Sequence, residues 1–498
     1  MPRKNVLLII ADEFRADCLS AAGNPVIQTP HLDAFARESV RFDQCYVQTS
    51  PCGPSRMCIY TGRYPCAHNS SDNMTPLMEA EDNLAMHLRR HGLDPAIMGY
   101  NDYAMDPRIL PDGHPHKTSL CYDYFLPGFN VALDHEYDSP QWYEALKRQG
   151  YPPEMCRREV MYAPNVPPDG PGDHNPFVYP AHYRAEDSES QFMTDVALDY
   201  CARHRGEGWF LSVNYIKPHG PYICPVPYHA MYDPAAMPPP VRRPEELAQP
   251  HPYFPRLLLN APGDLVEERD WRELRACYYG MISELDACLG RLFENLKASG
   301  QWDNTLIIFT SDHGSYMGDH YLTGKAHFYD AALRVPYILR DPDPAADATR
   351  GSVISDFCES IDTAPTICEF LGVPPHERFQ GRSLIGAARG RADAPPRPRI
   401  HHEYYYYSSL KPEEQAAANP DACRLWMVRD RRFKYVQFGE ETMPPILFDL
   451  QDDPAEFENL AARPEYTATV AAYCQHLLRW RMRHEDPRME RWANRYRT

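Results

Sequence analysis

Residues 50–63 read SPCGPSRMCIYTGR, and this stretch decides how the rest of the chain is interpreted. Pro54 suits the first turn of a helix because its missing N–H would have no partner there. A helix that starts at Pro54 places Cys52 just before the N-terminus, where free N–H groups favour negative charge. Arg56 adds a cation one turn later. The alternative is a buried structural cysteine at a loop-to-helix junction, and position alone does not choose between the two.

Bulk composition limits the classes of protein that fit this chain. Its 498 residues are 43% hydrophobic and 24% charged, with a formal net charge of -18. This length allows a large core and suggests about three domain-sized units. The acidic balance argues against a nucleic-acid partner or an anionic membrane surface. An anionic substrate therefore has to be attracted by local positive charge.

The first residues and the cysteines indicate a cytoplasmic protein. The apolar run at 6–11 is too short for a signal peptide, and Asp12-Glu13 interrupts it where a cleavage site should be. We interpret it as a buried strand. No run approaches the ~18 apolar residues of a membrane span. The fifteen cysteines include no CxxC pair, which favours a reducing compartment with mostly buried thiols.

Apolar runs alternate with helical periodicity, which predicts an α/β fold with a mainly parallel sheet covered by helices. The predicted strands are 6–11, 95–99, 209–216, 305–310 and 335–340. The predicted helices are 84–92 with Asp82 as the cap, 188–205 and 265–299. Residues 102–183 and the proline-rich 218–262 lack a clear period and are too long for plain connections, so we expect them to rim the active site or contact another subunit.

A smaller unit follows the linker at 391–399. Its predicted strands are 425–428, 433–437 and 446–450, and a helix then runs to about residue 484. We therefore predict a catalytic α/β domain over 1–385 and a C-terminal α+β subdomain with a short antiparallel sheet over 386–498.

Polar residues follow four predicted strands directly. They are Asp12-Glu13, Tyr100-Asn101-Asp102, Lys217-Pro218-His219 and Asp312-His313-Gly314. Ligands of open α/β sheets bind beyond the carboxyl ends of the strands, so the four groups and Cys52 predict one site.

Three carboxylates and one imidazole in this set predict a metal site. Asp12, Glu13, Asp312 and His313 form an oxygen-rich set that suits one divalent ion, Mn²⁺ or Ca²⁺, better than a structural zinc. Such an ion would bind and polarise the substrate oxyanion. Taken alone, Asp12-Glu13 would be better explained as a solvated turn or a helix cap, and it is the Asp312-His313 pair that makes the metal site the preferred interpretation.

Cations beside these acids predict substrate contacts. Lys217, His219 and Lys325 could neutralise a tetrahedral anion and the charge on a departing oxygen. His219 could protonate a leaving alkoxide, since histidine performs acid–base chemistry near neutral pH. A single exposed lysine is more often only solvated, and the acidic neighbours are what favour the functional interpretation.

Cys52-x-Pro54-Ser55-Arg56 followed by Thr61-Gly62-Arg63 resembles the signature of type I sulfatases and of the related phosphonate monoester hydrolases, in the alkaline phosphatase superfamily. Residues 432–436 and 447–460 resemble the C-terminal subdomains of sulfatases. The resemblance implies an alkaline-phosphatase-like fold and the oxidation of Cys52 to formylglycine by a formylglycine-generating enzyme. One hydroxyl of the hydrated aldehyde then attacks, and the other loses its proton to expel the product.

Matching motifs extend the resemblance to single residues. It implies metal-ligand positions for Asp12, Glu13, Asp312 and His313 with the modified Cys52 beside them, a formylglycine-steadying role for Arg56, and substrate contacts for Lys325 and His219.

Other positions resemble the phosphonate monoester hydrolase branch. Gly99-Tyr100 stands where typical arylsulfatases carry a Gly-Lys-Trp-His type motif, and 217–221 and 106–108 match the hydrolases. Asn73, Tyr100 and Lys217 thereby become substrate-binding candidates. This chain lacks the lysine of that arylsulfatase motif, and the loss of its positive charge disfavours dianionic phosphate monoesters. Phosphonate monoesters, phosphodiesters and sulfate monoesters all carry one negative charge, so this argument does not distinguish between them. Glu13 and Asn101-Asp102 depart from the pattern and leave the exact substrate open.

The leading prediction is a metal- and formylglycine-dependent hydrolase of phosphonate monoesters and phosphodiesters with promiscuous sulfate ester hydrolysis. The alternatives are a true aryl or alkyl sulfatase, and a non-catalytic metal-dependent binding protein with an unmodified Cys52. The expected partners are a small anionic ester, the formylglycine-generating enzyme and further copies of the chain in a dimer or tetramer.

Overall fold

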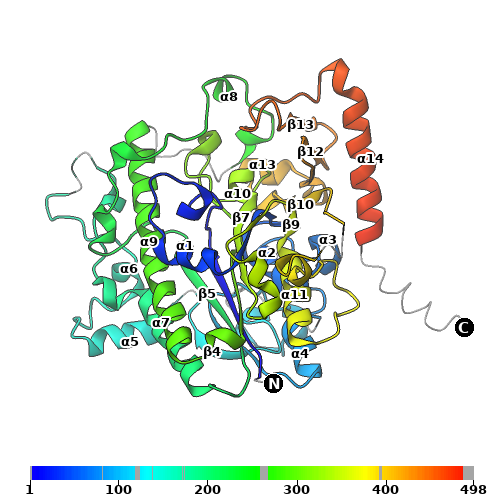
Figure 1. Cartoon of the computed structure of the whole chain (residues 1–498). Helices are drawn as coiled ribbons and strands as arrows, with labels where there is room; N and C mark the ends of the chain where they lie inside the picture. Colours follow the sequence, from blue (N-terminus) through cyan, green and yellow to red (C-terminus); the bar gives the residue numbers. More distant parts are fainter. Residues whose placement is uncertain are drawn as a thin grey trace, which may run out of the picture.

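A computed structural model describes residues 3–485 except 81, 118–123, 137, 171, 173, 258–266 and 392–394. Within these residues, the main sheet has the strand order β4-β3-β5-β1-β6-β7-β2-β8, and β9 also pairs with β2 (Figure 1). Its strands are β1 Asn5–Asp12, β2 Val40–Tyr46, β3 Pro95–Gly99, β4 Asn130–Asp134, β5 Phe210–Pro218, β6 Thr305–Ser311, β7 Arg334–Arg340, β8 Val353–Ile354 and β9 Cys358–Glu359. The pairs β6·β7 and β7·β2 are antiparallel and the others parallel, which confirms the predicted mainly parallel sheet.

Strand β1 lies in the middle of the sheet and explains why its sequence is apolar without alternation. Every residue of β1 is buried. Its odd-numbered residues Leu7 and Ile9 pack into one apolar cluster, and its even-numbered residues Leu8 and Ile10 pack into another. A strand that is covered by helices on both faces has no solvent-exposed face, so its sequence does not alternate between apolar and polar residues.

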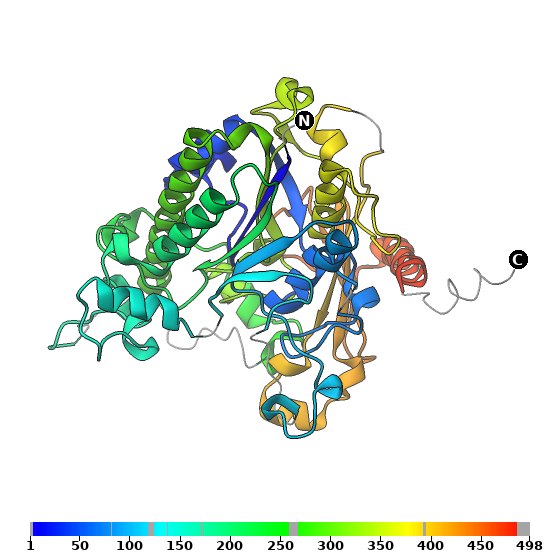
Figure 2. The ribbon, with the colours of Figure 1, turned by 90° about the horizontal axis from the view of Figure 1, so that it is seen from below.

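Helices cover both faces of the sheet (Figure 2). The first face carries α1 Pro30–Arg37, α7 Glu189–Arg203 and α9 Glu268–Ala298. The second carries α2 Cys52–Thr61, α4 Leu84–Arg90 and α11 Thr363–Leu371. The remaining α-helices of the described residues are α3 Pro65–His68, α5 Pro140–Arg148, α6 Arg158–Met161, α8 Glu245–Ala248, α10 Asp330–Leu333, α12 Ile385–Ala388, α13 Pro412–Ala417 and α14 Thr467–His484.

The C-terminal part forms a separate antiparallel sheet, as predicted. Its order is β10 Ile400–Tyr405, β11 Arg424–Arg429, β12 Phe433–Phe438 and β13 Ile446–Asp449. One face packs on α14 through Val428, Tyr435 and Leu477. The other face, which includes Met427 and Val436, belongs to the same apolar cluster as the main sheet. The two sheets therefore share one core, and the division at residue 385 stays a prediction.

Several sequence predictions need local correction. The helix of the signature begins at Cys52, two residues before Pro54, so Cys52 lies in the first turn and not ahead of it. Asn83, and not Asp82, caps α4 by accepting a hydrogen bond from the Met86 amide, and Asp82 pairs with Arg378 instead. The predicted start of the long helix at residue 265 lies outside the described residues.

Among the described residues, no helix has both the length and the apolar character needed to cross a bilayer.

Candidate active site

Backbone pairing brings the first two acids of the site together. β1 and β6 are parallel neighbours, and their register pairs Ala11 with Ser311. The next residue on each strand is therefore Asp12 or Asp312, and both leave the sheet at the same edge. The predicted gathering of polar residues beyond the strand ends holds for this pair, although 300 positions separate them in the sequence.

Helix α2 delivers Cys52 to the same edge. The Gly53 amide donates to the Asn73 side-chain oxygen at 3.1 Å. A Cβ on Gly53 would lie 2.8 Å from the carbonyl oxygen of Asp102, so only glycine allows the loop after β3 to approach the start of α2 this closely. Cys52 itself is 1% exposed.

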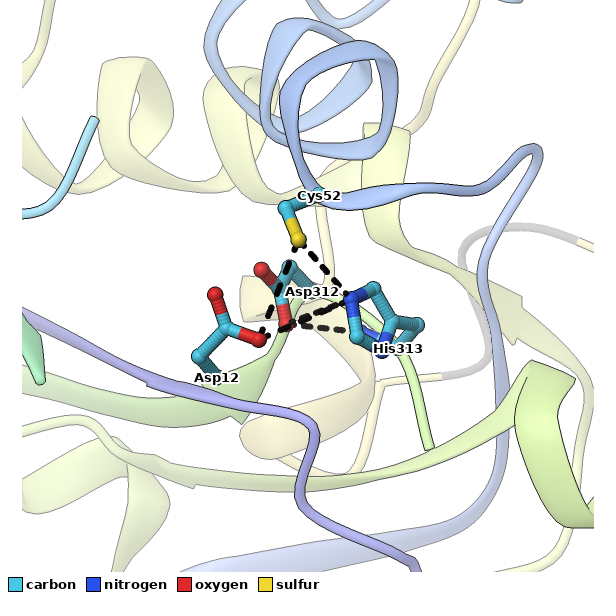
Figure 3. A group of neighbouring side chains, drawn as sticks. All are labelled: Asp12, Cys52, Asp312 and His313. Carbon is cyan, nitrogen blue, oxygen red and sulfur yellow. Dashed lines mark hydrogen bonds and ion pairs between the residues drawn. The ribbon is translucent and has the colours of Figure 1, made fainter. Parts of the chain in front are cut away.

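Asp12, Cys52, Asp312 and His313 point toward one another, and their ligand atoms all lie within 4.8 Å (Figure 3). His313 Nε2 lies 3.6 Å from Asp12 Oδ1, 3.7 Å from Asp312 Oδ1 and 3.3 Å from Cys52 Sγ. Burial lowers the pKa of His313, which keeps the imidazole neutral as a metal ligand must be. Buried carboxylates beside a neutral imidazole are the donor set of a hard or borderline divalent ion, so these residues fit the predicted metal.

All three side-chain nitrogens of Arg56 donate hydrogen bonds to groups around the site. Its Nε donates to Asp312 Oδ2 at 2.9 Å and its Nη2 to Asp12 Oδ2 at 3.1 Å. Nη1 donates to the Tyr100 carbonyl and to Asn214 Oδ1. Burial alone would raise the pKa of Asp312, but His313 and Arg56 outweigh it and hold that pKa below its usual value. Arg56 therefore orients the two acids and keeps Asp312 ionised.

Glu13 lies beside the four-residue group and not inside it. It groups with Asp12 and His219 in a second possible ligand set. Its Oε1 accepts hydrogen bonds from Tyr222 and Ser315, and its Oε2 lies 3.5 Å from His219 Nε2 and 3.7 Å from Lys325 Nζ. Burial opposes ionisation, but these cations keep the pKa of Glu13 below its usual value. Glu13 thus links the acids to the cations of the site.

The three predicted cations are placed differently. Lys325 Nζ lies 3.0 Å from Cys52 Sγ, and His219 is half-buried beside Glu13. Lys217 is buried, and its Nζ lies 2.5 Å from Glu284 Oε2 of α9 and 3.4 Å from the Tyr183 hydroxyl. The structure therefore brings Lys325 to Cys52 and His219 to Glu13, whereas Lys217 is paired with Glu284 of α9.

Asn73 and Tyr100 line the approach to the site. Both are half-buried. The Arg56 guanidinium lies 5.0 Å from the Tyr100 ring centroid. Burial raises the pKa of Tyr100, so its hydroxyl keeps its proton.

The sequence patterns assign no role to two buried acids in and beside the loop that follows Tyr100, Asp102 and Glu136. Glu136 accepts hydrogen bonds from the amides of Asn101 and Asp102. Both carboxylate oxygens of Asp102 are buried without a hydrogen-bond partner in the described part of the chain. The position of Asp102 directly after a predicted strand was the available signal, whereas Glu136 lies in a stretch without period.

An unmodified Cys52 would be a poor nucleophile here. Burial, with Asp12 adding to it, raises the pKa of the thiol well above its ordinary value, although Lys325 opposes the rise. The thiol therefore stays protonated at neutral pH, and only a thiolate attacks efficiently.

Comparison with known proteins places the chain in a family. The sulfatase family model matches residues 4–373, and the C-terminal model of N-sulphoglucosamine sulphohydrolase matches residues 318–483. The multifunctional alkaline phosphatase superfamily protein PehA of Trinickia caryophylli is 36% identical, over 98% of this chain and 96% of its own length.

Two solved structures share the whole fold. The phosphonate monoester hydrolase of Agrobacterium radiobacter superposes with a TM-score of 0.88 at 34% identity, over 97% of both chains. The phosphonate monoester hydrolase SpPMH from Silicibacter pomeroyi gives a TM-score of 0.88 at 36% identity, over 97% of this chain and 96% of its own. The predicted alkaline-phosphatase-like fold is thereby confirmed.

Proposed function

This chain belongs to the sulfatase family of the alkaline phosphatase superfamily and is a hydrolase of ester bonds, and we propose that it cleaves phosphonate monoesters and phosphodiesters, with sulfate ester hydrolysis as a side activity. The relatives at 34–36% identity that are named for an ester are phosphonate monoester hydrolases. An arylsulfatase of Clostridium perfringens is only 25% identical.

The supply of cations at the site supports a singly charged substrate. Arg56 is bound to Asp12 and Asp312, and Lys217 is paired with Glu284. Lys325 is then the one lysine of the described residues whose ammonium contacts the Cys52 sulfur. This observation carries the proposal, because a dianionic phosphate monoester would need a further cation to balance its second charge.

Asp12, Asp312 and His313 would hold the metal ion, with Glu13 beside them, and we favour Mn²⁺ over Ca²⁺ because one ligand is a nitrogen. When bound, the ion would act as a Lewis acid toward the substrate oxygens. Oxidised to formylglycine, Cys52 would supply a hydrated aldehyde as the nucleophile.

The protein's own groups supply the rest of the chemistry. The Lys325 ammonium faces the place where negative charge develops. Desolvation opposes its protonation, but the carboxylates of Asp12 and Glu13 outweigh it and hold the pKa of Lys325 above the usual value. His219 lies at the open side, where a leaving alkoxide would depart, and donates the proton it needs. Asn73 and Tyr100 lie beside Gly53 and Arg56 and would orient the ester.

Kinetics on matched esters test the proposal. We expect kcat/KM for p-nitrophenyl phenylphosphonate and bis(p-nitrophenyl) phosphate to exceed that for p-nitrophenyl phosphate by about 10²-fold or more, since the dianion lacks a partner for its second charge. p-Nitrophenyl sulfate should be a slower substrate than the phosphonate. A preference for the sulfate by orders of magnitude would instead identify a true sulfatase.

Mass analysis of the Cys52 peptide tests the modification. Conversion of the thiol to an aldehyde lowers the peptide mass. A natural protein that is wholly unmodified and inactive would favour the metal-dependent binding protein. Oxidation requires a formylglycine-generating enzyme as a maturation partner, and assembly as a homodimer or homotetramer belongs to the same proposal.

A further inference from the structure

Asp102 is a buried acid in the loop beside the site, without a hydrogen-bond partner for its side chain in the part of the chain that the structure describes. Its side chain is 1% exposed, and neither carboxylate oxygen accepts a hydrogen bond within the described residues. Its backbone adopts a left-handed conformation with φ 62°. A buried acceptor left unpaired is costly. Such a group in a native structure calls for an explanation, and a bound ligand is one.

The neighbours of Asp102 place it against the reacting centre. Its carbonyl oxygen lies against Gly53, the residue after Cys52. Its carboxylate interacts electrostatically with Arg56, Asp12 and Lys325, and it contributes to the raised pKa of the Cys52 thiol. Half-buried Tyr100, two residues earlier, and Asn73, which contacts Gly53, lie on the approach side.

Neither nearby cation is free to satisfy this carboxylate. Arg56 donates its hydrogen bonds to the side chains of Asp312, Asp12 and Asn214 and to the Tyr100 carbonyl. Lys325 contacts Cys52 and Glu13. Glu136, behind the loop, is also buried and adds a further acid. Acids thus outnumber cations around the place that must accept an anionic ester.

We propose that Asp102 is a specificity-determining residue that pairs with an ammonium group on the organic part of the substrate. This inference rests on the proposed function and narrows it to zwitterionic esters, in which one negative ester charge is joined to a protonated amine. The ester oxygens face Lys325, while the ammonium donates its hydrogen bonds to Asp102 and, as an adjacent positive charge, favours the ionised carboxylate over the protonated one. Charge-assisted hydrogen bonds of this kind are short and strong in a buried setting.

A pair of esters of equal size isolates this contact. p-Nitrophenyl 2-aminoethyl phosphate carries an ammonium, and p-nitrophenyl n-propyl phosphate replaces it with a methyl group. For the wild-type enzyme we expect kcat/KM to favour the aminoethyl ester by about tenfold or more, the gain of one charge-assisted hydrogen bond. Asp102→Asn, which keeps the size of the side chain, should reduce this ratio to about threefold or less, since a neutral amide loses the charge assistance.

Two controls separate the contact from general attraction. Asp106→Asn removes a charge from the same loop, but its carboxylate is already paired with Arg108, so the substrate ratio should stay at the wild-type value. Calorimetry on Cys52→Ala, which cannot turn the esters over, measures the same preference as a difference in Kd. The Cys52→Ala, Asp102→Asn double variant should lose that preference.

The outcomes distinguish the two proposals. Hydrolysis of both esters at similar rates by the wild type, or a ratio that Asp102→Asn leaves unchanged, overturns the role of Asp102 and leaves the proposed function standing. Binding that prefers the aminoethyl ester with no hydrolysis of either compound supports the subsite and removes the proposed activity.

Discussion

At the scale of single residues, the site is a closed set of buried charges in which each group depends on another. Arg56 orients Asp12 and Asp312, Glu13 connects them to Lys325, and Lys325 contacts Cys52. Removing one partner leaves a buried charge without compensation, so substitutions here affect chemistry and stability together. The exception is Cys52, whose thiol carries no charge at neutral pH.

Cys52→Ala should abolish turnover and preserve the fold. The substitution removes the nucleophile and leaves a residue that favours the first turn of α2. We expect kcat/KM to fall by at least about 10³-fold. The loss of unfolding free energy should be about 1 kcal/mol, the cost of one small buried atom. Steady-state kinetics and thermal melts measure the two effects, and retained turnover would exclude Cys52 as the nucleophile.

Asp312→Asn should weaken metal binding and slow the reaction together. Asp312 Oδ1 accepts from the amides of Glu13 and His313, and Oδ2 accepts from Arg56. An amide cannot accept at both positions, because its nitrogen is a donor. Elemental analysis of the purified variant should show reduced metal content, with kcat lowered by about 10²-fold or more. Unchanged metal content and rate would remove Asp312 from the ligand set.

Asp102 gives the stability of the protein a pH dependence with a defined sign. Burial raises the pKa of Asp102 to about 8, with Arg56 opposing and Asp12 adding to the rise. Because the pKa is higher in the folded state, the protonated carboxyl stabilises the fold. This stabilisation is fully present below the unfolded-state pKa near 4 and is lost as the pH rises through about 8. Between pH 5 and 8, the wild type should therefore lose stability relative to Asp102→Asn, by at most about 1.4 kcal/mol per pH unit.

Urea unfolding of the two proteins at several pH values measures this difference. Asp106→Asn is the matched control. Its arginine partner lowers the pKa of Asp106, so that carboxyl stays ionised over the whole range and its variant should run parallel to the wild type. A wild-type curve that is also parallel to Asp102→Asn would show that the buried acid does not titrate here.

At the scale of helices and strands, the pairing of β5 with α9 determines what Lys217 does. The Lys217 ammonium and Glu284 form a buried ion pair between these two elements. Lys217→Met should leave Glu284 unpaired and lower the free energy of unfolding by about 3–5 kcal/mol. The Lys217→Met, Glu284→Gln double variant should recover part of this loss, since no uncompensated charge remains.

Chemical denaturation of the single and double variants tests this assignment. A single variant with normal stability and a strongly raised KM would return Lys217 to the substrate-binding role that its sequence motif suggested.

The sequence predicted the apolar strands of the main sheet and the strands β11, β12 and β13 of the small sheet, and it missed β2, β4, β8, β9 and β10. β1, β3, β5, β6 and β7 are nearly all buried and read as apolar runs. β2 contains Arg41, Asp43 and Gln44, and β4 is an edge strand with three exposed residues, so neither shows such a run. β10 was missed because it is rich in His and Tyr.

The positions of polar residues at the ends of strands predicted the site better than their chemical types did. Asp12 and Asp312 follow adjacent strands, and their meeting could be inferred from strand order alone. Which cation faces Cys52 could not be inferred in this way, because it depends on side-chain direction. Lys217 lies in β5 and His219 directly follows this strand, yet only His219 lies beside Glu13. Lys217 pairs with Glu284 of α9. The sequence predicts the helix but does not indicate that it packs beside Lys217.

At the scale of the whole molecule, the two sheets share one apolar core. Side chains of β11, β12 and β13 share an apolar cluster with β1, α2 and α11. Buried Lys434 of β12 also reaches Asp330 of α10 and the Phe328 carbonyl. The small sheet therefore completes the core of the catalytic unit, and a cut at residue 385 would expose that core to water.

A chain truncated to residues 1–385 should fail to fold. The loss of the small sheet uncovers a large apolar surface, and such surfaces lead to aggregation. We expect the fragment to be insoluble, while the full chain melts in one transition by calorimetry. A soluble fragment with a cooperative melt would instead establish two autonomous domains divided where the sequence suggested.

The burial of Cys52 constrains when during synthesis the proposed oxidation to formylglycine would have to occur. The groups that enclose its sulfur, His313 and Lys325, lie 261 and 273 positions later in the chain. A nascent polypeptide on the ribosome thus offers residue 52 to a modifying enzyme long before these groups emerge, and completed folding ends that opportunity. Conditions that accelerate folding relative to the oxidation step should then yield a well-formed but permanently inactive fraction.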